Sequence, residues 1–186
     1  MKDLMRPAWA LLGVAALSGC AMTAPNYSPS IDNLEILKRS AAPMALGAFT
    51  LQSGLAGGTS IGLRGNSMNS SVGGDYAAYL AEALRQELAL AGKLDPKSRI
   101  VISGLLLKND IAAAGMATNS GEIEARFSVS RDGQPRYAKA HRVEMSWESS
   151  FAGAVAIPKA MQQYPLMVQK LIGQLLADPE FIAALK

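Results

Sequence analysis

The residue with the most distinctive chemistry in this chain is Cys20, the only cysteine among 186 residues. Its thiol is a nucleophile that can be modified covalently. The chain before it begins with a positive segment containing Lys2 and Arg6 and continues as an apolar run from Ala8 to Leu17. This run is too short to span a bilayer as a retained helix, and the charge before it is typical of a cleaved export signal. The sequence therefore predicts export, with processing close to Cys20.

The tetrapeptide Leu17-Ser18-Gly19-Cys20 resembles the lipobox of bacterial lipoproteins. The small residues Ser18 and Gly19 leave the peptide bond before Cys20 uncrowded for a processing enzyme. The resemblance implies a diacylglycerol on the Cys20 sulfur, cleavage before Cys20, and an acyl chain such as palmitate on the new amine. Because each buried methylene contributes about 0.8 kcal/mol, one chain holds a protein marginally and two or three hold it firmly. An ordinary export signal followed by an incidental cysteine is the alternative.

The organisation of the chain follows from this motif. Residues 1–19 are predicted to be a lipoprotein signal peptide, 20–30 an acylated cysteine with a flexible tether, and 31–186 a single periplasmic domain. The tether is expected because two prolines lie among Ser, Thr and Asn between Ala21 and Ser30. Ala21, in place of an aspartate after the cysteine, favours the outer membrane by analogy with bacterial sorting. With a single cysteine, no disulfide can form within the chain.

The composition argues against nucleic-acid binding and against catalysis. The formal net charge is only +3, which is too small to favour a nucleic-acid partner. The single histidine, His141, lies on a predicted strand, and no nucleophile motif or His/Cys cluster accompanies it. Glu122 and Glu124 share one face of a strand, where a solvated stripe is the simpler interpretation. We therefore predict a non-enzymatic protein with no metal and no cofactor.

The first half of the chain predicts a helix over 33–39 and strands over 44–51 and 60–64, joined as a hairpin through the glycines at 54–58. The polar, glycine-bearing stretch 65–74 is expected to be a surface loop. A clear amphipathic helix follows over 76–91, with Asp75 as its N-cap and Gly92 as its stop. Its polar side is predicted to carry Glu82, Arg85, Gln86 and Glu87.

The second half predicts a central strand over 99–108 and a strand pair joined by Asp132-Gly133. A final helix over 157–177 is expected to kink or restart near Tyr164 because of Pro165, and Asp178-Pro179 starts a short terminal helix. The predicted fold is an α+β two-layer sandwich: a mainly antiparallel sheet of about five strands, with two main helices packed on one face.

Several segments together resemble a family of small, uncharacterised proteobacterial envelope lipoproteins, and the similarity covers most of the chain after Cys20. More distantly, the order of elements is similar to that of YajG-like and transport-auxiliary lipoproteins, which implies an α/β domain on an acylated cysteine. The segments that carry the first resemblance are Arg64 to Met68, Gly73-Gly74, Ala83 to Leu88, Trp147 to Phe151, Gly153-Ala154 and Leu175 to Pro179.

Two functions of different classes remain open. The first is an interaction or adaptor module that docks onto an envelope protein partner. Its candidate contacts are Asn66, Ser67, Met68, Trp147 and Phe151, because aromatic residues dominate binding hot spots. For Trp147 and Phe151, a place at the end of the core is the alternative.

The second function is a carrier or transport-auxiliary protein for lipid or another apolar ligand, suggested by nine methionines, Met161 and Met167 among them. Core filling is the alternative interpretation of these methionines. The basic residues Arg131, Arg136, Lys139 and Arg142 around the predicted strand pair also allow contact with anionic lipid.

Overall fold

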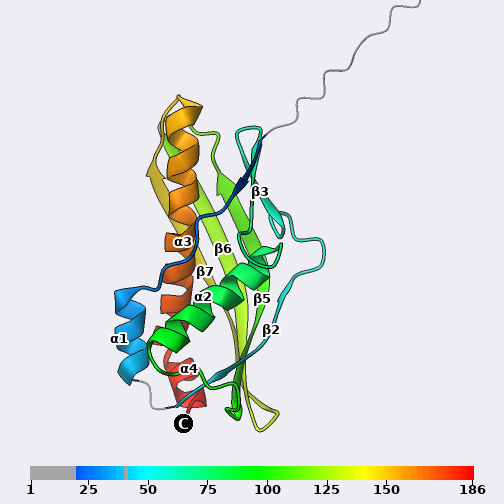
Figure 1. Ribbon diagram of the computed structural model, residues 1–186, viewed down its shortest axis with the longest axis vertical. Helices are drawn as coiled ribbons and strands as arrows, with labels where there is room; N and C mark the ends of the chain where they lie inside the picture. The colour runs from blue at the N-terminus through cyan, green and yellow to red at the C-terminus, as the bar shows by residue number, and fades with distance from the viewer. Residues whose placement is uncertain (1–19, 40–41) are drawn as a thin grey trace, which may run out of the picture.

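A computed structural model describes residues 20–39 and 42–186 of the chain (Figure 1). It contains two β-sheets, with helices packed on one face of the larger one. The predicted α+β class is confirmed. The elements are β1 (Ala21–Thr23), α1 (Ile31–Arg39), β2 (Ala45–Leu51), β3 (Ser60–Leu63), β4 (Asn66–Asn69), α2 (Tyr76–Leu90), β5 (Ile100–Ala112), β6 (Thr118–Arg131), β7 (Gln134–Glu148), α3 (Gly153–Ala177) and α4 (Pro179–Ala184).

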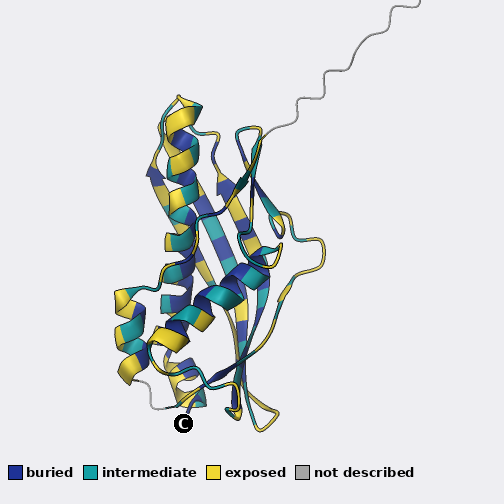
Figure 2. Ribbon diagram, in the orientation of Figure 1, coloured by how far each residue is buried: buried dark blue, intermediate teal, exposed yellow. Residues whose placement is uncertain are grey.

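The larger sheet has the strand order β2-β5-β6-β7. Strands β5, β6 and β7 are antiparallel neighbours, and β2 lies parallel to β5. The turn between β6 and β7 is formed by Asp132 and Gly133, both with positive φ (53° and 76°), as a two-residue hairpin requires. Figure 2 shows buried positions alternating with intermediate or exposed ones along β6. The alternation predicted for this strand is confirmed, since Ile123, Ala125, Phe127 and Val129 are all buried.

The predicted single sheet of about five antiparallel strands is wrong, because β3 leaves β2 and joins a second sheet of order β1-β4-β3. The glycine-rich stretch does not turn the chain back along β2. It crosses β5 instead, where Asn109 Nδ2 donates to the Gly57 carbonyl at 2.7 Å. A Cβ on Gly57 would lie 1.9 Å from the Asn109 oxygen, so only glycine permits this crossing. Part of the expected loop over 65–74 is strand β4.

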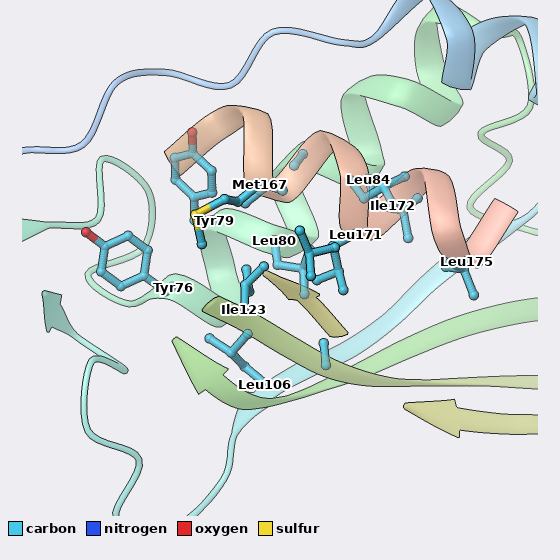
Figure 3. Packing of buried hydrophobic residues seen from close by; sticks show 14 of the residues in the cluster. Tyr76, Tyr79, Leu80, Leu84, Leu106, Ile123, Met167, Leu171, Ile172 and Leu175 are labelled. Atoms are coloured by element: carbon cyan, nitrogen blue, oxygen red, sulfur yellow. The ribbon is translucent and has the colours of Figure 1, made fainter. Parts of the chain in front are cut away.

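Helices α2 and α3 cover one face of the larger sheet, α2 over β2 and β5 and α3 over β6 and β7 (Figure 1). The predicted ends of α2 are confirmed. Asp75 Oδ1 accepts from the Ala78 N–H at 2.7 Å, and Gly92, with φ 67°, follows the last turn. Figure 3 shows the core between the helices and the sheet. It is formed by Tyr76, Tyr79, Leu80, Leu84, Leu106, Ile123, Met167, Leu171, Ile172 and Leu175.

Helix α3 continues through Pro158 and Pro165 to Ala177, so the helix restart expected at Pro165 does not occur. Tyr164, Met167 and Val168, on either side of this proline, are all buried. Their packing offsets the lost backbone hydrogen bond. Asp178 ends α3 and caps α4, as predicted, with Oδ1 accepting from the Glu180 N–H at 2.8 Å. Within the described residues, no helix is both long and apolar enough to cross a membrane.

Candidate functional site at the Cys20 end

Cys20 is exposed and stands immediately before β1. Its backbone N–H donates to Asn66 Oδ1 at 3.2 Å, and its carbonyl accepts from the Ser67 N–H at 3.2 Å. From there β1 runs parallel to β4, with Ala21 opposite Ser67. The backbone of Cys20 is therefore fixed to the domain on both sides while its side chain remains accessible. The residues of the predicted cleavage motif, Leu17, Ser18 and Gly19, lie outside the described part of the chain.

The segment after Cys20 is packed on the domain, so the prediction of a flexible tether over 20–30 is wrong for this stretch. The Ala24 N–H donates to the Asn69 carbonyl at 2.8 Å, and Tyr79 donates to the Pro25 carbonyl at 2.8 Å. Ala24 and Tyr27 are buried. The prolines are compatible with this extended course, because it follows the surface of α2 without forming a helix.

Glu87 on α2 holds the end of this segment. Its Oε1 accepts from Tyr27 Oη at 2.5 Å, from the Ser30 N–H at 2.9 Å and from Asn33 Nδ2 at 3.1 Å. Glu87 is fully buried, so its predicted place on the polar side of α2 is wrong. Burial, followed by the hydrogen bond to Glu87, raises the pKa of Tyr27 and keeps its hydroxyl a donor. The residues between Cys20 and α1 are thus fixed at both ends.

Arg64 connects three segments at the Cys20 end. It lies in the turn between β3 and β4, where Arg64 and Gly65 both have positive φ (51° and 80°). Its guanidinium donates to the carbonyls of Ala113 at 2.6 Å and Phe151 at 2.9 Å, and to the Gly115 carbonyl. The β3–β4 turn beside Cys20 is therefore tied to the β5–β6 loop and to the β7–α3 connection. All of these lie at the top of Figure 1.

We expect Arg64→Ala to lower the free energy of unfolding by about 2–3 kcal/mol, because three carbonyls lose a charged donor. Urea unfolding measures this loss, and limited proteolysis should show faster cleavage within residues 113–117. Arg99→Ala is the matched control. The Arg99 side chain is 78% exposed and pairs with Asp132 at 3.1 Å, so its loss should stay within about 0.5 kcal/mol. Equal losses in the two variants would contradict this role of Arg64.

The structure separates the five candidate contact residues. Met68 is fully buried and Trp147 is 8% exposed, so both belong to the core and neither is available to a partner. Asn66 and Ser67 are half-buried and hold Cys20 through the bonds given above. Phe151 is 80% exposed and is the only one of the five whose side chain is free for contact.

His141 lies in a small cluster of polar side chains that joins β7 to Asp178, the N-cap of α4. Its Nε2 is 2.6 Å from Tyr137 Oη, which donates to Asp178 Oδ2 at 3.1 Å, and Lys139 Nζ is 2.9 Å from the same oxygen. Burial lowers the pKa of His141 and raises that of Tyr137. Burial opposes ionisation of Asp178, but hydrogen bonds from Lys139, Glu180 and Tyr137 outweigh it and lower its pKa to about 2. The groups thus satisfy one another, and the phenol is not activated as a nucleophile.

Four of the other charged residues considered from the sequence, Glu122, Arg131, Lys139 and Arg142, are also paired. Glu122 binds Arg142 at 2.8 Å and Lys108 at 3.6 Å on the outer face of the sheet. Arg131 donates to the carbonyls of Leu185 and Lys186, and Lys139 pairs with Asp178 and Glu180. Within the described ranges, no three His, Cys, Asp or Glu side chains are grouped as a metal site.

An apolar groove of about 320 Å³ lies between α1, α3 and α4, remote from Met161 and Met167. Leu37, Leu176 and Phe181 form its floor and are nearly fully buried, while Ile182 is 41% exposed. Arg39 stands at its edge and also pairs with Glu35 at 3.6 Å. The groove is near the opposite end of the molecule from Cys20 (Figure 1).

Cys20 and Phe151 were candidates from the sequence, and their roles stay predictions, whereas the structural roles of Arg64 and Glu87 were not predicted. The burial of Glu87 could have been predicted, because Glu87 lies four residues after Ala83 and three after Leu84, on the apolar face of α2. Arg64 offered a weaker signal. An arginine followed by glycine and asparagine between two short apolar stretches suggests a tight hairpin, but the carbonyls that it binds are 49 to 87 residues away along the chain.

No family model matches the chain, and no curated protein is similar to it in sequence. Solved structures are similar in fold. A Xanthomonas campestris protein described as DUF330 shares 12% identity over 85% of this chain and 95% of its own, with a TM-score of 0.54. A candidate lipoprotein from Caulobacter crescentus shares 11% over 82% and 95%, with a TM-score of 0.48. A minor lipoprotein from Acinetobacter baumannii shares 9% over 74% and 91%, with a TM-score of 0.42. The chain thus shares its fold with the DUF330 protein of Xanthomonas campestris.

Proposed function

We propose that this protein is a lipid-anchored lipoprotein of the bacterial envelope, acylated at Cys20 after cleavage behind Gly19. One observation carries the proposal: the cysteine of the lipobox-like motif is an exposed residue at the start of an ordered strand. A residue fixed by its backbone with a free thiol is a suitable base for an anchor. Residues 20–186 then form one periplasmic domain, and Ala21 favours the outer membrane.

The contacts of the Cys20 backbone suit the processed form. After cleavage the nitrogen is an amine, and N-acylation converts it back to an amide that still carries one N–H. The hydrogen bond to Asn66 Oδ1 at 3.2 Å is therefore retained in the acylated protein. Sγ takes no part in holding β1, so it can carry a thioether without disturbing the strand.

Cys20→Ser is expected to abolish acylation. The protein should then leave the membrane fraction for the soluble fraction, or it should accumulate as the unprocessed precursor. Fractionation and the intact mass of the purified chain measure both effects. The matched control is the double variant Cys20→Ser, Ser28→Cys. It restores a thiol eight residues later, outside the lipobox-like motif, and it should also lack lipid. Membrane attachment of the Cys20→Ser protein after alkaline extraction would show that another segment anchors the chain.

For the anchored domain we propose an adaptor role, in which it binds an envelope protein and performs no catalysis. The titratable residues around His141 and Glu122 bind one another, which leaves none of them free for catalysis. The helices cover one face of the larger sheet and leave its outer face open to a partner. The alternative is a carrier of an apolar ligand. It is favoured by the apolar groove between α1, α3 and α4.

Native mass spectrometry separates the two roles. The full-length lipoprotein should be released from its own membranes in mild detergent and isolated through a C-terminal tag. A stoichiometric protein companion would support the adaptor. A lone chain that retains an apolar small molecule would support the carrier, and Ile182→Asp at the groove edge should then reduce the retained mass.

A further inference from the structure

Three strongly exposed apolar side chains lie at the Cys20 end: Met116 (71% exposed), Phe151 (80%) and Val155 (56%). They come from the β5–β6 loop, the β7–α3 connection and the first turn of α3. We propose that these three residues form a membrane-docking tip, which enters the interface of the bilayer that holds the Cys20 acyl chains. This inference rests on the proposed lipid anchor and adds the surface with which the domain meets the lipid.

The first argument is the fixed position of the tip relative to Cys20. Cys20 is bound to Asn66, two residues beyond Arg64, and the Arg64 guanidinium holds the carbonyl of Phe151 and that of Gly115, the residue before Met116. On the other side of Met116, the Ala117 carbonyl accepts from the Ser149 N–H at 2.8 Å. These hydrogen bonds therefore fix the segments that carry the apolar side chains relative to Cys20.

The second argument is that no flexible linker separates Cys20 from the described domain. The Cys20 carbonyl is hydrogen-bonded to β4, and β1 follows at once. A lipid on Sγ or on the nitrogen therefore draws this end of the molecule to the membrane. The turn between β6 and β7 is at the far end of a 14-residue strand, about 45 Å away at roughly 3.3 Å per residue. The basic residues Arg131 and Arg136 beside that turn are thus remote from the lipid, so the contact with anionic lipid considered from the sequence is not favoured.

The third argument is the chemistry of the tip. The charged residues that border these segments are Arg64 in the β3–β4 turn, Glu148 at the end of β7 and Lys159 in α3. Arg64 is occupied by carbonyls, and Lys159 lies 4.0 Å from Glu148. Such a surface offers little attraction to anionic head groups, whereas aromatic and aliphatic side chains gain by leaving water. An aromatic residue such as Phe151 is suited to the interfacial region. Docking is therefore expected to be insensitive to salt.

Single cysteines provide the test. Because Cys20 is the only cysteine and acylation blocks it, a new cysteine is the only thiol available to an environment-sensitive dye. Phe151→Cys and Met116→Cys report on the tip. Leu90→Cys, at the end of α2 and 62% exposed, is the matched control. The labelled full-length lipoproteins are reconstituted into vesicles of phosphatidylethanolamine and phosphatidylglycerol. We expect quenching by aqueous iodide to fall several-fold at 116 and 151, at low and high salt alike, and to stay unchanged at 90.

The outcomes that overturn the tip are distinct from those that overturn the anchor. Dye at 151 that is quenched as strongly as dye at 90, on protein that floats with the vesicles, would refute docking while leaving the anchor intact. Protection that depends on protein density in the vesicle would assign the surface to a second copy and would also refute it. If the unsubstituted protein reacts with the dye and does not float, Cys20 is unacylated, and the proposed anchor fails together with the tip.

Discussion

Replacing Trp147 by alanine is expected to lower the free energy of unfolding by about 3–5 kcal/mol, the range for a large aromatic removed from a core. Trp147 is 8% exposed, and its Cη2 lies against Gly121, where a built Cβ would be 3.2 Å from it. Gly121 leaves the space that the indole fills beneath α3. Equilibrium urea unfolding of the Trp147→Ala protein measures the loss.

Phe151→Ala is the matched control, because it removes a similar aromatic side chain only four residues away. That side chain is 80% exposed, so its removal should change stability by no more than about 0.5 kcal/mol. The pair of variants thus separates a core residue from a surface residue. Equal stabilities for the two would mean that Trp147 is not part of the core.

Replacing Glu87 by alanine is expected to lower the free energy of unfolding by about 3–5 kcal/mol, because several buried donors lose a shared acceptor. The change removes the acceptor of Tyr27 Oη and of the Ser30 N–H. It also removes one of the two acceptors of Asn33 Nδ2, which still donates to the Gln169 carbonyl at 3.0 Å. An unsatisfied buried donor carries its full desolvation penalty. The loss should appear in urea unfolding and as faster proteolysis between residues 20 and 30, because Glu87 also fastens that segment to α2.

Two further substitutions make the Glu87 result interpretable. Glu87→Gln retains one oxygen acceptor and should cost less than Glu87→Ala. Glu82→Ala, on the same helix, removes a partly exposed carboxylate that pairs with Arg85 at 2.6 Å, and it should cost less than about 1 kcal/mol. If Glu87→Ala were as stable as Glu82→Ala, the three hydrogen bonds would not stabilise the fold.

The parts of the fold that depend on local chemistry could be predicted from the sequence. Asp75 and Gly92 mark the ends of α2 because a carboxylate cap and a residue with positive φ act on their own neighbours. The alternation along β6 and the turn at Asp132-Gly133 likewise need only adjacent residues. In the candidate site, the motif that ends at Cys20 was available in the same way. The sequence did not distinguish the exposed Phe151 from the buried Trp147.

The parts that depend on distant contacts could not be predicted. The pairing of β2 with β5 in place of β3 is decided by the crossing of Gly57 over Asn109, which no local pattern encodes. Strand β1 has three residues, too few to show a period of two, and its strand character comes from its partner β4. Pro165 suggests a helix break from sequence alone. The contacts that keep α3 continuous are distant in sequence, because Tyr164 packs on Tyr76 and Tyr79 of α2 and Met167 lies against Gly121 of β6.

The sequence separation of the Cys20 contacts has a consequence for the order of events during biogenesis. The acceptor Asn66 is 46 residues beyond Cys20, and Glu87 is 60 residues beyond Tyr27. Contacts of such long range form late, because the loop between them must close first. The segment around Cys20 is therefore expected to stay extended until β4 and α2 have folded, and in the proposed export this means until both have crossed the membrane. In the proposed lipoprotein, modifying enzymes would meet an open peptide in that interval, and docking of β1 afterwards would withdraw the processed N-terminus from proteases.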